Sequence, residues 1–318
     1  MYSLTIIGAG QISCGYDNPN SKNILTHIHG ALSCDVISFD SIVETNKIQR
    51  KKMKDKWGDN LNIFPSLEEA FHFNKSEIVI IATPTITHFD IIKSILDIYI
   101  PKIIVVEKPV VSSFDEWKEL QNILENKNIK IVINFIRRFD PSINKIRNLL
   151  NRKDIKISHF YGTFAKGLLH NGSHMMDLID MLFGNIQKFN YLEKEVINND
   201  IFGKFYIESS NANGIISNIS NDNLSLFEIT IYTNQLKIEI RGEEQIIYIN
   251  EINDSNKFEG FVSYSNEMTL ENTLNKSGLN TLEYIVDILE NESAYKKVYE
   301  SQKNVNNFIY KVHKELME

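Results

Sequence analysis

The sequence contains few cysteines and no long hydrophobic run. Cys14 and Cys34 are its two cysteines among 318 residues, too few for a disulfide framework, so we expect reduced thiols. The longest apolar runs, such as residues 103–106, have the length of a strand, whereas a transmembrane helix needs roughly 20 apolar residues. The first residues lack the basic leader of a signal peptide. These features predict a cytoplasmic protein with no membrane partner.

A surplus of basic residues is also absent. The chain carries 34 Lys and Arg against 41 Asp and Glu, a formal net charge of -7, which argues against a protein that follows nucleic-acid phosphates. Hydrophobic residues make up 42% and charged residues 24%, as in an ordinary globular protein. A chain of 318 residues is too long for one ordinary hydrophobic core. We therefore expect two domains and a small-molecule partner, and no nucleic acid.

Short apolar runs alternate with helical segments in the first part of the chain. The runs are nearly continuous in apolar character, as in strands covered on both faces, and lie at residues 4–7, 36–39, 78–81, 103–106 and 129–133. Ser66 and Ser113 each stand before a glutamate with capping-box spacing, which indicates two helix starts. This alternation is typical of a parallel sheet with crossover helices. We expect residues 1–135 to form an α/β domain of the Rossmann type.

The pattern changes from about Pro141. The expected elements are a helix, a strand and a further helix, at residues 143–150, at 156–163 and from about 172. Later, residues 227–232 and 236–240 alternate polar and apolar side chains, which is typical of antiparallel strands with one solvent-exposed face. We therefore expect residues 136–318 to form a C-terminal α+β domain with an open, predominantly antiparallel sheet.

Two glycines follow the first expected strand directly. Gly8 and Gly10 can form a tight turn and let the backbone approach a pyrophosphate, with Gln11 and Ile12 next in the chain. Ser13 replaces the third glycine of this fingerprint. The alternative is an ordinary turn between a strand and a loop. The position directly after a strand favours a dinucleotide site.

Asp40 ends the second apolar run. An acidic side chain at this place hydrogen-bonds the hydroxyls of the adenosine ribose and repels a 2′-phosphate, so we expect NAD as the cofactor, with NADP disfavoured. Extra polar residues around 17–21 separate the glycines from the following helix, which we expect near Thr26.

Two further loops follow strands of the same expected sheet. Thr83 and Pro84 follow one strand, with His88 close behind, and Glu107 and Lys108 follow the next. The carboxyl ends of parallel strands meet at one edge of a sheet, where ligands of such sheets bind. We therefore assign all five residues to the cofactor site. The alternative is that polar groups gather at this edge by chance.

Several motifs occur in a fixed order along the chain. They are Gly8-Ala9-Gly10, Ala82-Thr83-Pro84-Thr85 with His88, Glu107-Lys108-Pro109, Arg137-Arg138-Phe139-Asp140-Pro141, and Gly172-Ser173-His174 with Asp177. In this order they resemble the signatures of the glucose-fructose oxidoreductase, inositol dehydrogenase and MocA family (Gfo/Idh/MocA), from about residue 4 to 184. The resemblance implies a nicotinamide cofactor, Lys108 in the active site and His174 near the transferred hydride. It also implies a second domain that binds a sugar-like substrate and forms homodimers or homotetramers through its open sheet.

The side chains of Lys108 and His174 suit hydride transfer from an alcohol. Histidine titrates near neutral pH and can exchange the hydroxyl proton, while an ammonium group stabilises charge that develops on the oxygen. The alternative for His174 is a packing or capping role at a helix start. Candidate substrate contacts are Lys166, His170, Asn171, Arg137 and Asp177. The side chains of Lys166 and Arg137 suit an anionic group of the substrate. The alternative for Arg137 is an ion pair between domains, because arginines near a domain junction often form such pairs.

His170 stands four positions before His174, where many members of the family carry an aspartate. The segment 166–174 is similar to that of a subset of the family associated with surface-polysaccharide sugars. His170, His174 and Asp177 could instead form a metal triad, but His170 precedes the expected helix, so we expect no metal. The sequence predicts an NAD-dependent oxidoreductase acting on a sugar, sugar acid or nucleotide sugar. The alternative is a regulatory protein of the same fold that senses a dinucleotide without catalysis.

Overall fold

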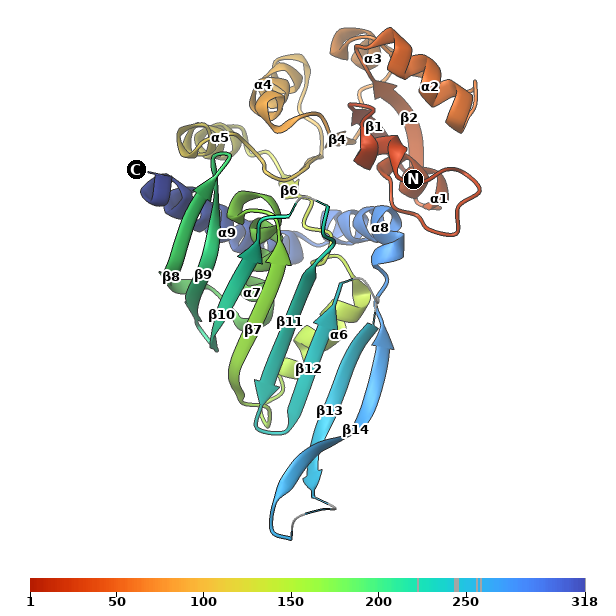
Figure 1. Cartoon of the computed structure of the whole chain (residues 1–318). Coiled ribbons are helices and arrows are strands. Elements are labelled where there is room, and N and C mark those ends of the chain that lie inside the picture. The colour runs from red at the N-terminus through yellow and green to blue at the C-terminus, as the bar shows by residue number, and fades with distance from the viewer. Residues whose placement is uncertain (222, 243–245, 256, 258, 318) are drawn as a thin grey trace. The chain divides into compact units, whose positions relative to one another are not determined.

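The computed structural model describes all residues of the chain except 222, 243–245, 256, 258 and 318 (Figure 1). The chain divides into two compact units. Unit 1 comprises Met1–Phe139 and Leu274–Gln302, and unit 2 comprises Asp140–Thr273 and Lys303–Glu318. Residues 274–302 therefore belong with the N-terminal part. This division differs from the single boundary expected after residue 135.

Unit 1 is built on a six-stranded parallel sheet. Its strands are β1 (Tyr2–Ile7), β2 (Ile37–Val43), β3 (Ile63–Phe64), β4 (Ile78–Ile81), β5 (Ile103–Val106) and β6 (Ile131–Ile133). Their order in space is β3-β2-β1-β4-β5-β6, which is that of a dinucleotide-binding Rossmann fold. The predicted fold class of this part of the chain is confirmed.

The predicted strands agree best where the apolar runs are continuous. β4 and β5 have the predicted bounds, and every residue in them is buried, because both faces of the sheet are covered. β2 continues to Val43 instead of ending at residue 39. β3 was not predicted, because its two residues are too few to show a period.

The helices of unit 1 are α1 (His27–Ser33), α2 (Lys47–Trp57), α3 (Leu67–Phe73), α4 (His88–Ile98), α5 (Phe114–Lys127), α8 (Ser277–Glu290) and the first part of α9 (Glu292–Met317). Both predicted serine caps are confirmed, since Ser66 Oγ accepts from the Glu69 N–H and Ser113 Oγ from the Glu116 N–H, each at 3.2 Å. Among the described helices of the chain, none is both long and apolar enough to cross a lipid bilayer.

The return of residues 274–302 to unit 1 depends on contacts between distant parts of the sequence. The backbones of α1 and α8 come so close that a Cβ added to Gly30 would lie 2.3 Å from the Gly278 carbonyl oxygen. In α9, the Gln302 side chain accepts from the Ile133 N–H at 2.9 Å and donates to the Ile133 carbonyl at 2.8 Å. Gln302 thus satisfies backbone groups of β6, the last strand of the sheet.

Unit 2 is built on an eight-stranded sheet. Its strands are β7 (Ile157–Ala165), β8 (Ile186–Ile197), β9 (Asp200–Ser209), β10 (Asn213–Ile219), β11 (Phe227–Thr233), β12 (Leu236–Arg241), β13 (Ile246–Asp254) and β14 (Val262–Glu271). Their order is β14-β13-β12-β11-β7-β10-β9-β8. β7 and β10 are parallel, and the other neighbours are antiparallel. The predicted, predominantly antiparallel sheet is confirmed.

One face of this sheet packs against α6 (Pro141–Leu150), α7 (Ser173–Phe183) and the part of α9 that belongs to unit 2 (Figure 1). These helices share one apolar core with alternate strand residues such as Phe160 and Ile231. The residues between them, such as Tyr161, point to the other face of the sheet. The second unit is therefore a sheet with helices on one face.

Candidate active site

A groove of about 990 Å³ lies at the carboxyl ends of β1, β2 and β4 in unit 1. Its volume is at the upper end of the range of roughly 300–1,000 Å³ that is typical of ligand sites. Six of the residues predicted to hold the dinucleotide line it, namely Gly8, Gly10, Gln11, Ile12, Thr83 and Pro84. Loops that are far apart in the sequence thus meet at the sheet edge where such folds bind their ligands.

The first turn of the groove requires glycine. Gly8 has a φ of +95°, and a Cβ there would lie 2.8 Å from both the Ala82 carbonyl oxygen and the Thr83 methyl group. An L side chain would meet both backbone strain and a clash with the neighbouring loop. Gly8 therefore keeps the two loops in contact and leaves the floor of the groove free of side chains, as a bound dinucleotide requires.

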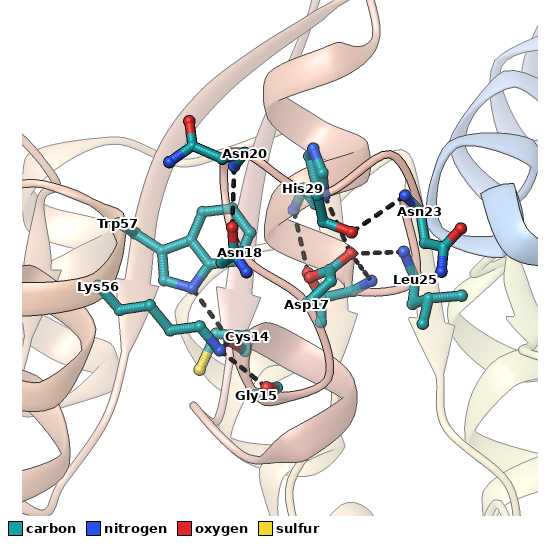
Figure 2. Close-up of polar contacts among 12 residues, drawn as sticks. Cys14, Gly15, Asp17, Asn18, Asn20, Asn23, Leu25, His29, Lys56 and Trp57 are labelled. Atoms are coloured by element: carbon teal, nitrogen blue, oxygen red, sulfur yellow. Dashed lines mark hydrogen bonds and ion pairs between the residues drawn. The ribbon is translucent and has the colours of Figure 1, made fainter.

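The chain does not continue from Gly10 into a long α-helix. Gln11–Gly15 forms a five-residue π-helix, and α1 begins only at His27. Asp17 organises the inserted loop between them (Figure 2). Its carboxylate accepts from the N–H of Leu25 at 2.6 Å, from the Thr26 hydroxyl at 2.5 Å, and pairs with His29 Nδ1 at 3.0 Å. Burial alone would raise the pKa of Asp17, but the hydrogen bonds from Thr26, Leu25 and His29 hold it below its usual value.

The predicted role of Asp40 is corrected by its position. Asp40 lies inside β2, not at its end, and does not line the groove. Its carboxylate accepts from the Ser76 hydroxyl and from the Asn74 amide, the latter at 2.6 Å. The strand runs past Asp40 because the next residue, Ser41, is buried with its hydroxyl 2.9 Å from that of Thr5. A polar residue that seemed to end the strand is instead paired with the segment between α3 and β4.

Glu44 is the acidic residue that follows the end of β2. It lines the groove, and its carboxylate accepts from the Ala9 N–H at 3.0 Å and from the Asn46 N–H at 2.8 Å. On the other side, the Gln49 amide donates to the Ala9 carbonyl at 2.6 Å. Sequence reasoning missed Glu44, although it follows the last apolar pair, Ile42 and Val43. Glu44, and not Asp40, is thus the acidic residue beside the groove at the end of β2.

His88 lies behind the groove and not in it. Its side chain is buried, with Nδ1 3.1 Å from the Pro109 carbonyl oxygen and Nε2 2.8 Å from that of Thr83. The imidazole thus joins the loop after β4 to the loop after β5. His88 does not line the groove. Its contacts hold these two loops together, and its predicted contact with the cofactor stays a prediction.

Glu107 likewise does not line the groove. Its carboxylate pairs with His27 Nε2 at 2.8 Å and accepts from the Asn134 amide at 2.5 Å. Burial alone would raise the pKa of the Glu107 carboxyl, but His27, Asn134 and the Lys108 ammonium hold it below its usual value. Lys108 follows, half-buried, and the peptide bond to Pro109 is cis. The predicted cofactor contacts of Glu107 and Lys108 stay predictions, since neither residue lines the groove and the Glu107 carboxylate has partners within unit 1.

The predicted substrate residues fall into both units. Arg137 belongs to unit 1, whereas His174 and the other candidates belong to unit 2. His174 lies in the first turn of α7 with 7% of its surface exposed, and Asp177, one turn later, is also buried. Within the described residues, no group of three His, Cys, Asp or Glu side chains is arranged to hold a metal ion. The alternative of a metal triad in this segment therefore has no geometric support.

The segment before α7 is a second π-helix, Leu168–Gly172, where a loop had been expected around His170. Lys166, just before it, has a left-handed φ of +72°. The Asn171 amide donates to the Ala165 carbonyl at 2.9 Å, and the Ser173 hydroxyl donates to the His170 carbonyl at 2.8 Å. Backbone contacts of this kind fix the segment, while the His170 side chain is exposed.

Residues 3–135 match the model of the Gfo/Idh/MocA family, described as an oxidoreductase family with an NAD-binding Rossmann fold. The resemblance seen in the sequence is confirmed over these residues, as are the NAD-binding fold and the oxidoreductase class. A search of curated proteins finds no match.

Solved structures show the same fold over nearly the whole chain. The dehydrogenase MviM from Clostridium difficile has a TM-score of 0.68 at 19% identity, over 98% of this chain and 99% of its own. An oxidoreductase from Agrobacterium radiobacter, in complex with NAD+, L-tartaric acid and magnesium, has a TM-score of 0.70 at 15% identity, over 97% and 94%. UDP-N-acetylglucosamine 3-dehydrogenase GnnA from Acidithiobacillus ferrooxidans has a TM-score of 0.67 at 14% identity, over 98% and 96%. At these identities the likeness establishes the fold alone.

Proposed function

Since residues 3–135 form an NAD-binding domain of the Gfo/Idh/MocA oxidoreductase family, we propose that the chain transfers a hydride between NAD and a hydroxyl or carbonyl carbon of a sugar-like molecule. The observation that carries this proposal is the groove of unit 1, where Gly8 leaves room for a pyrophosphate and Glu44 lies at the end of β2. Both features fit a dinucleotide. The nicotinamide, when bound, supplies or accepts the hydride.

Two side chains of the chain are assigned to the substrate oxygen. The Lys108 ammonium binds this oxygen and stabilises the negative charge that develops on it as the hydride leaves. His174 takes the hydroxyl proton during oxidation and returns it during reduction. The burial of His174 at the start of α7 supports this role, because a buried imidazole is shielded from bulk water.

Sugars, sugar acids and nucleotide sugars are the proposed substrate class. The fold shared with a UDP-N-acetylglucosamine dehydrogenase supports a nucleotide sugar as one member of this class. Lys166 and Arg137 would bind an anionic group of the substrate, and His170, Asn171 and Asp177 its hydroxyl groups. The Asn218 amide donates to the Lys166 carbonyl at 3.0 Å, and this contact holds the backbone that carries the ammonium group.

Glu44 is proposed to make the groove prefer NAD over NADP. Its carboxylate would accept from ribose hydroxyls and repel a 2′-phosphate. We expect NADH to bind the wild-type protein more tightly than NADPH. In Glu44→Ser the ratio of the two dissociation constants should fall by roughly tenfold or more, because the repulsion between the Glu44 carboxylate and the 2′-phosphate is lost. Fluorescence titration with both nucleotides measures the ratio.

The matched control for Glu44 is Asp40→Ser. Asp40 points to Asn74 and Ser76 and not to the groove, so its removal should leave the ratio unchanged. A wild-type protein that binds NADPH more tightly, or a Glu44→Ser ratio equal to that of the wild type, would exclude Glu44 as the determinant.

The outer face of the sheet in unit 2 is proposed to join two or four copies of the chain. His159, Tyr161, Tyr232 and Tyr264 gather there, with the rings of His159 and Tyr232 stacked at 4.8 Å. Such a cluster on an open face favours association. Light scattering of the purified protein should show a dimer or tetramer. The double variant Tyr161→Asp, Tyr232→Asp should be a monomer. Leu32→Asp, which changes an exposed residue of α1, should keep the oligomeric state of the wild type. A wild-type monomer would contradict this assignment.

The second candidate is a regulatory protein that binds NAD without catalysis. Both candidates predict nucleotide binding in the groove, so binding alone cannot separate them. A panel of free sugars, sugar acids and sugar nucleotides, followed through the absorbance of NADH, does separate them. We expect at least one member to be turned over. Failure of the whole panel, together with NAD-dependent capture of a partner protein, would favour the regulatory function.

A further inference from the structure

A buried pair of titratable side chains lies directly behind Lys108. His27, the first residue of α1, has 1% of its surface exposed. Its Nε2 lies 2.8 Å from Oε1 of Glu107, the residue that precedes Lys108 in the chain. The proposed chemistry uses neither His27 nor Glu107. A buried carboxylate is costly unless its hydrogen-bond partners are well placed, so the position of this pair next to Lys108 calls for an explanation.

The Glu107 carboxylate is held from two other secondary-structure elements. Asn134, directly after β6, donates its amide to Oε1 at 2.5 Å. Asn134 is itself oriented by α8, because the Thr281 hydroxyl lies 3.1 Å from its carbonyl oxygen. Among the groups that keep the pKa of Glu107 low despite its burial, His27 has the largest effect, and Lys108 contributes through its charge. Without His27, this carboxylate would lose the hydrogen bond that lowers its pKa most, and it would be more easily protonated.

The inserted loop places His27 in this position. Thr26 caps α1 by accepting from the His29 N–H at 3.3 Å, and its hydroxyl donates to Asp17 at 2.5 Å. Figure 2 shows the Asp17 carboxylate joined to the Leu25 backbone nitrogen and to the His29 imidazole. The segment that separates the glycine-rich turn from α1 therefore fixes the first turn of α1, and with it the imidazole that faces Glu107.

We propose that His27 is a positioning residue for Lys108. Through its contact with Glu107 it fixes this carboxylate directly before Lys108 in the chain, where the carboxylate orients the turn and its negative charge acts on the Lys108 ammonium group. The proposal rests on the proposed function only in the use of Lys108 to bind the substrate oxygen. The charged or titratable groups that act most strongly on Glu107 are His27 from α1 and Lys108 from its own loop. The Glu107 carboxylate therefore links His27 of α1 to Lys108.

The first test measures the protonation of Lys108 in the absence of substrate. Acetic anhydride acylates only the neutral amine, so the pH dependence of Lys108 acetylation, followed by mass spectrometry of its peptide, reports the protonation of this lysine. Glu107→Gln keeps the volume but removes the charge, and should move the midpoint to lower pH by about half a unit or more, because the ammonium loses an attractive neighbour. His27→Ala should move it in the same direction.

Two variants serve as controls. His27→Gln retains an N–H donor at the position of Nε2 and should keep the midpoint close to that of the wild type. His72→Gln replaces an exposed histidine on α3 and should have no effect. An unchanged midpoint in Glu107→Gln overturns the proposal, even if His27→Ala fails to fold.

The second test is kinetic and uses the substrate found in the panel. His27→Ala should lower kcat by about tenfold, as expected for a misplaced catalytic group, with NADH affinity unchanged and with recovery of kcat in His27→Gln. Equal kcat in wild type and His27→Ala overturns the positioning role. If no substrate is turned over, the proposed function fails, but the acetylation experiment still decides whether His27 and Glu107 act on Lys108.

Discussion

His174→Ala is expected to lower kcat/KM by about 10² to 10⁴-fold, which is the usual contribution of a general acid or base. His174 is buried in the first turn of α7, where its imidazole is shielded from bulk water. Histidine exchanges protons readily near neutral pH, and the alanine variant leaves no group to carry the hydroxyl proton. NADH affinity should stay nearly unchanged, because the groove is lined by residues of unit 1 alone.

His170→Ala is the matched control for this prediction. His170 lies four residues earlier in the same segment, but its side chain is exposed, so its loss should have a milder effect. Steady-state kinetics of both variants, with fluorescence titration of NADH, separates catalysis from binding. Full activity in His174→Ala would exclude the acid-base role and leave packing at the start of α7 as its function.

Lys108→Ala should lower kcat/KM by about 10² to 10³-fold, the effect of removing one positioned group that stabilises a developing oxyanion. The loss should appear mainly in kcat, since the ammonium interacts most strongly with the charge of the transition state. Lys102→Ala is the control, because Lys102 is an exposed lysine shortly before β5, paired with Glu77 at 2.5 Å. Surface pairs of this kind contribute little. A Lys108→Ala variant as active as Lys102→Ala would contradict the assignment.

The central strands could be predicted from the sequence because they are buried on both faces. β4 and β5 are continuous apolar runs and match the predicted bounds. The end of β2 could not be predicted in this way, because Asp40 and Ser41 interrupt its apolar pattern and only their partners in space keep them in the strand. Because the end of β2 was misplaced, the prediction chose Asp40, whereas the acidic residue that lines the groove is Glu44.

Contacts between distant parts of the chain account for the other differences. Residues 274–302 return to unit 1 through the close approach of Gly30 and Gly278, which no local pattern in α8 indicates. The motif around Lys108 was recognised, and its position after β5 was predicted. The partner of Glu107 was not, because His27 lies 80 residues away in the sequence and follows an inserted loop.

The most direct test of the proposed function is deuterium transfer from NADH labelled at C4 to a carbon of the product. The panel of sugars, sugar acids and sugar nucleotides is offered in oxidised form, and the products are analysed by mass spectrometry. The proposed function predicts that at least one product gains one deuterium, and that Lys108→Ala combined with His174→Ala abolishes the transfer while NADH still binds. Tight NADH binding without deuterium in any product of the panel would contradict it.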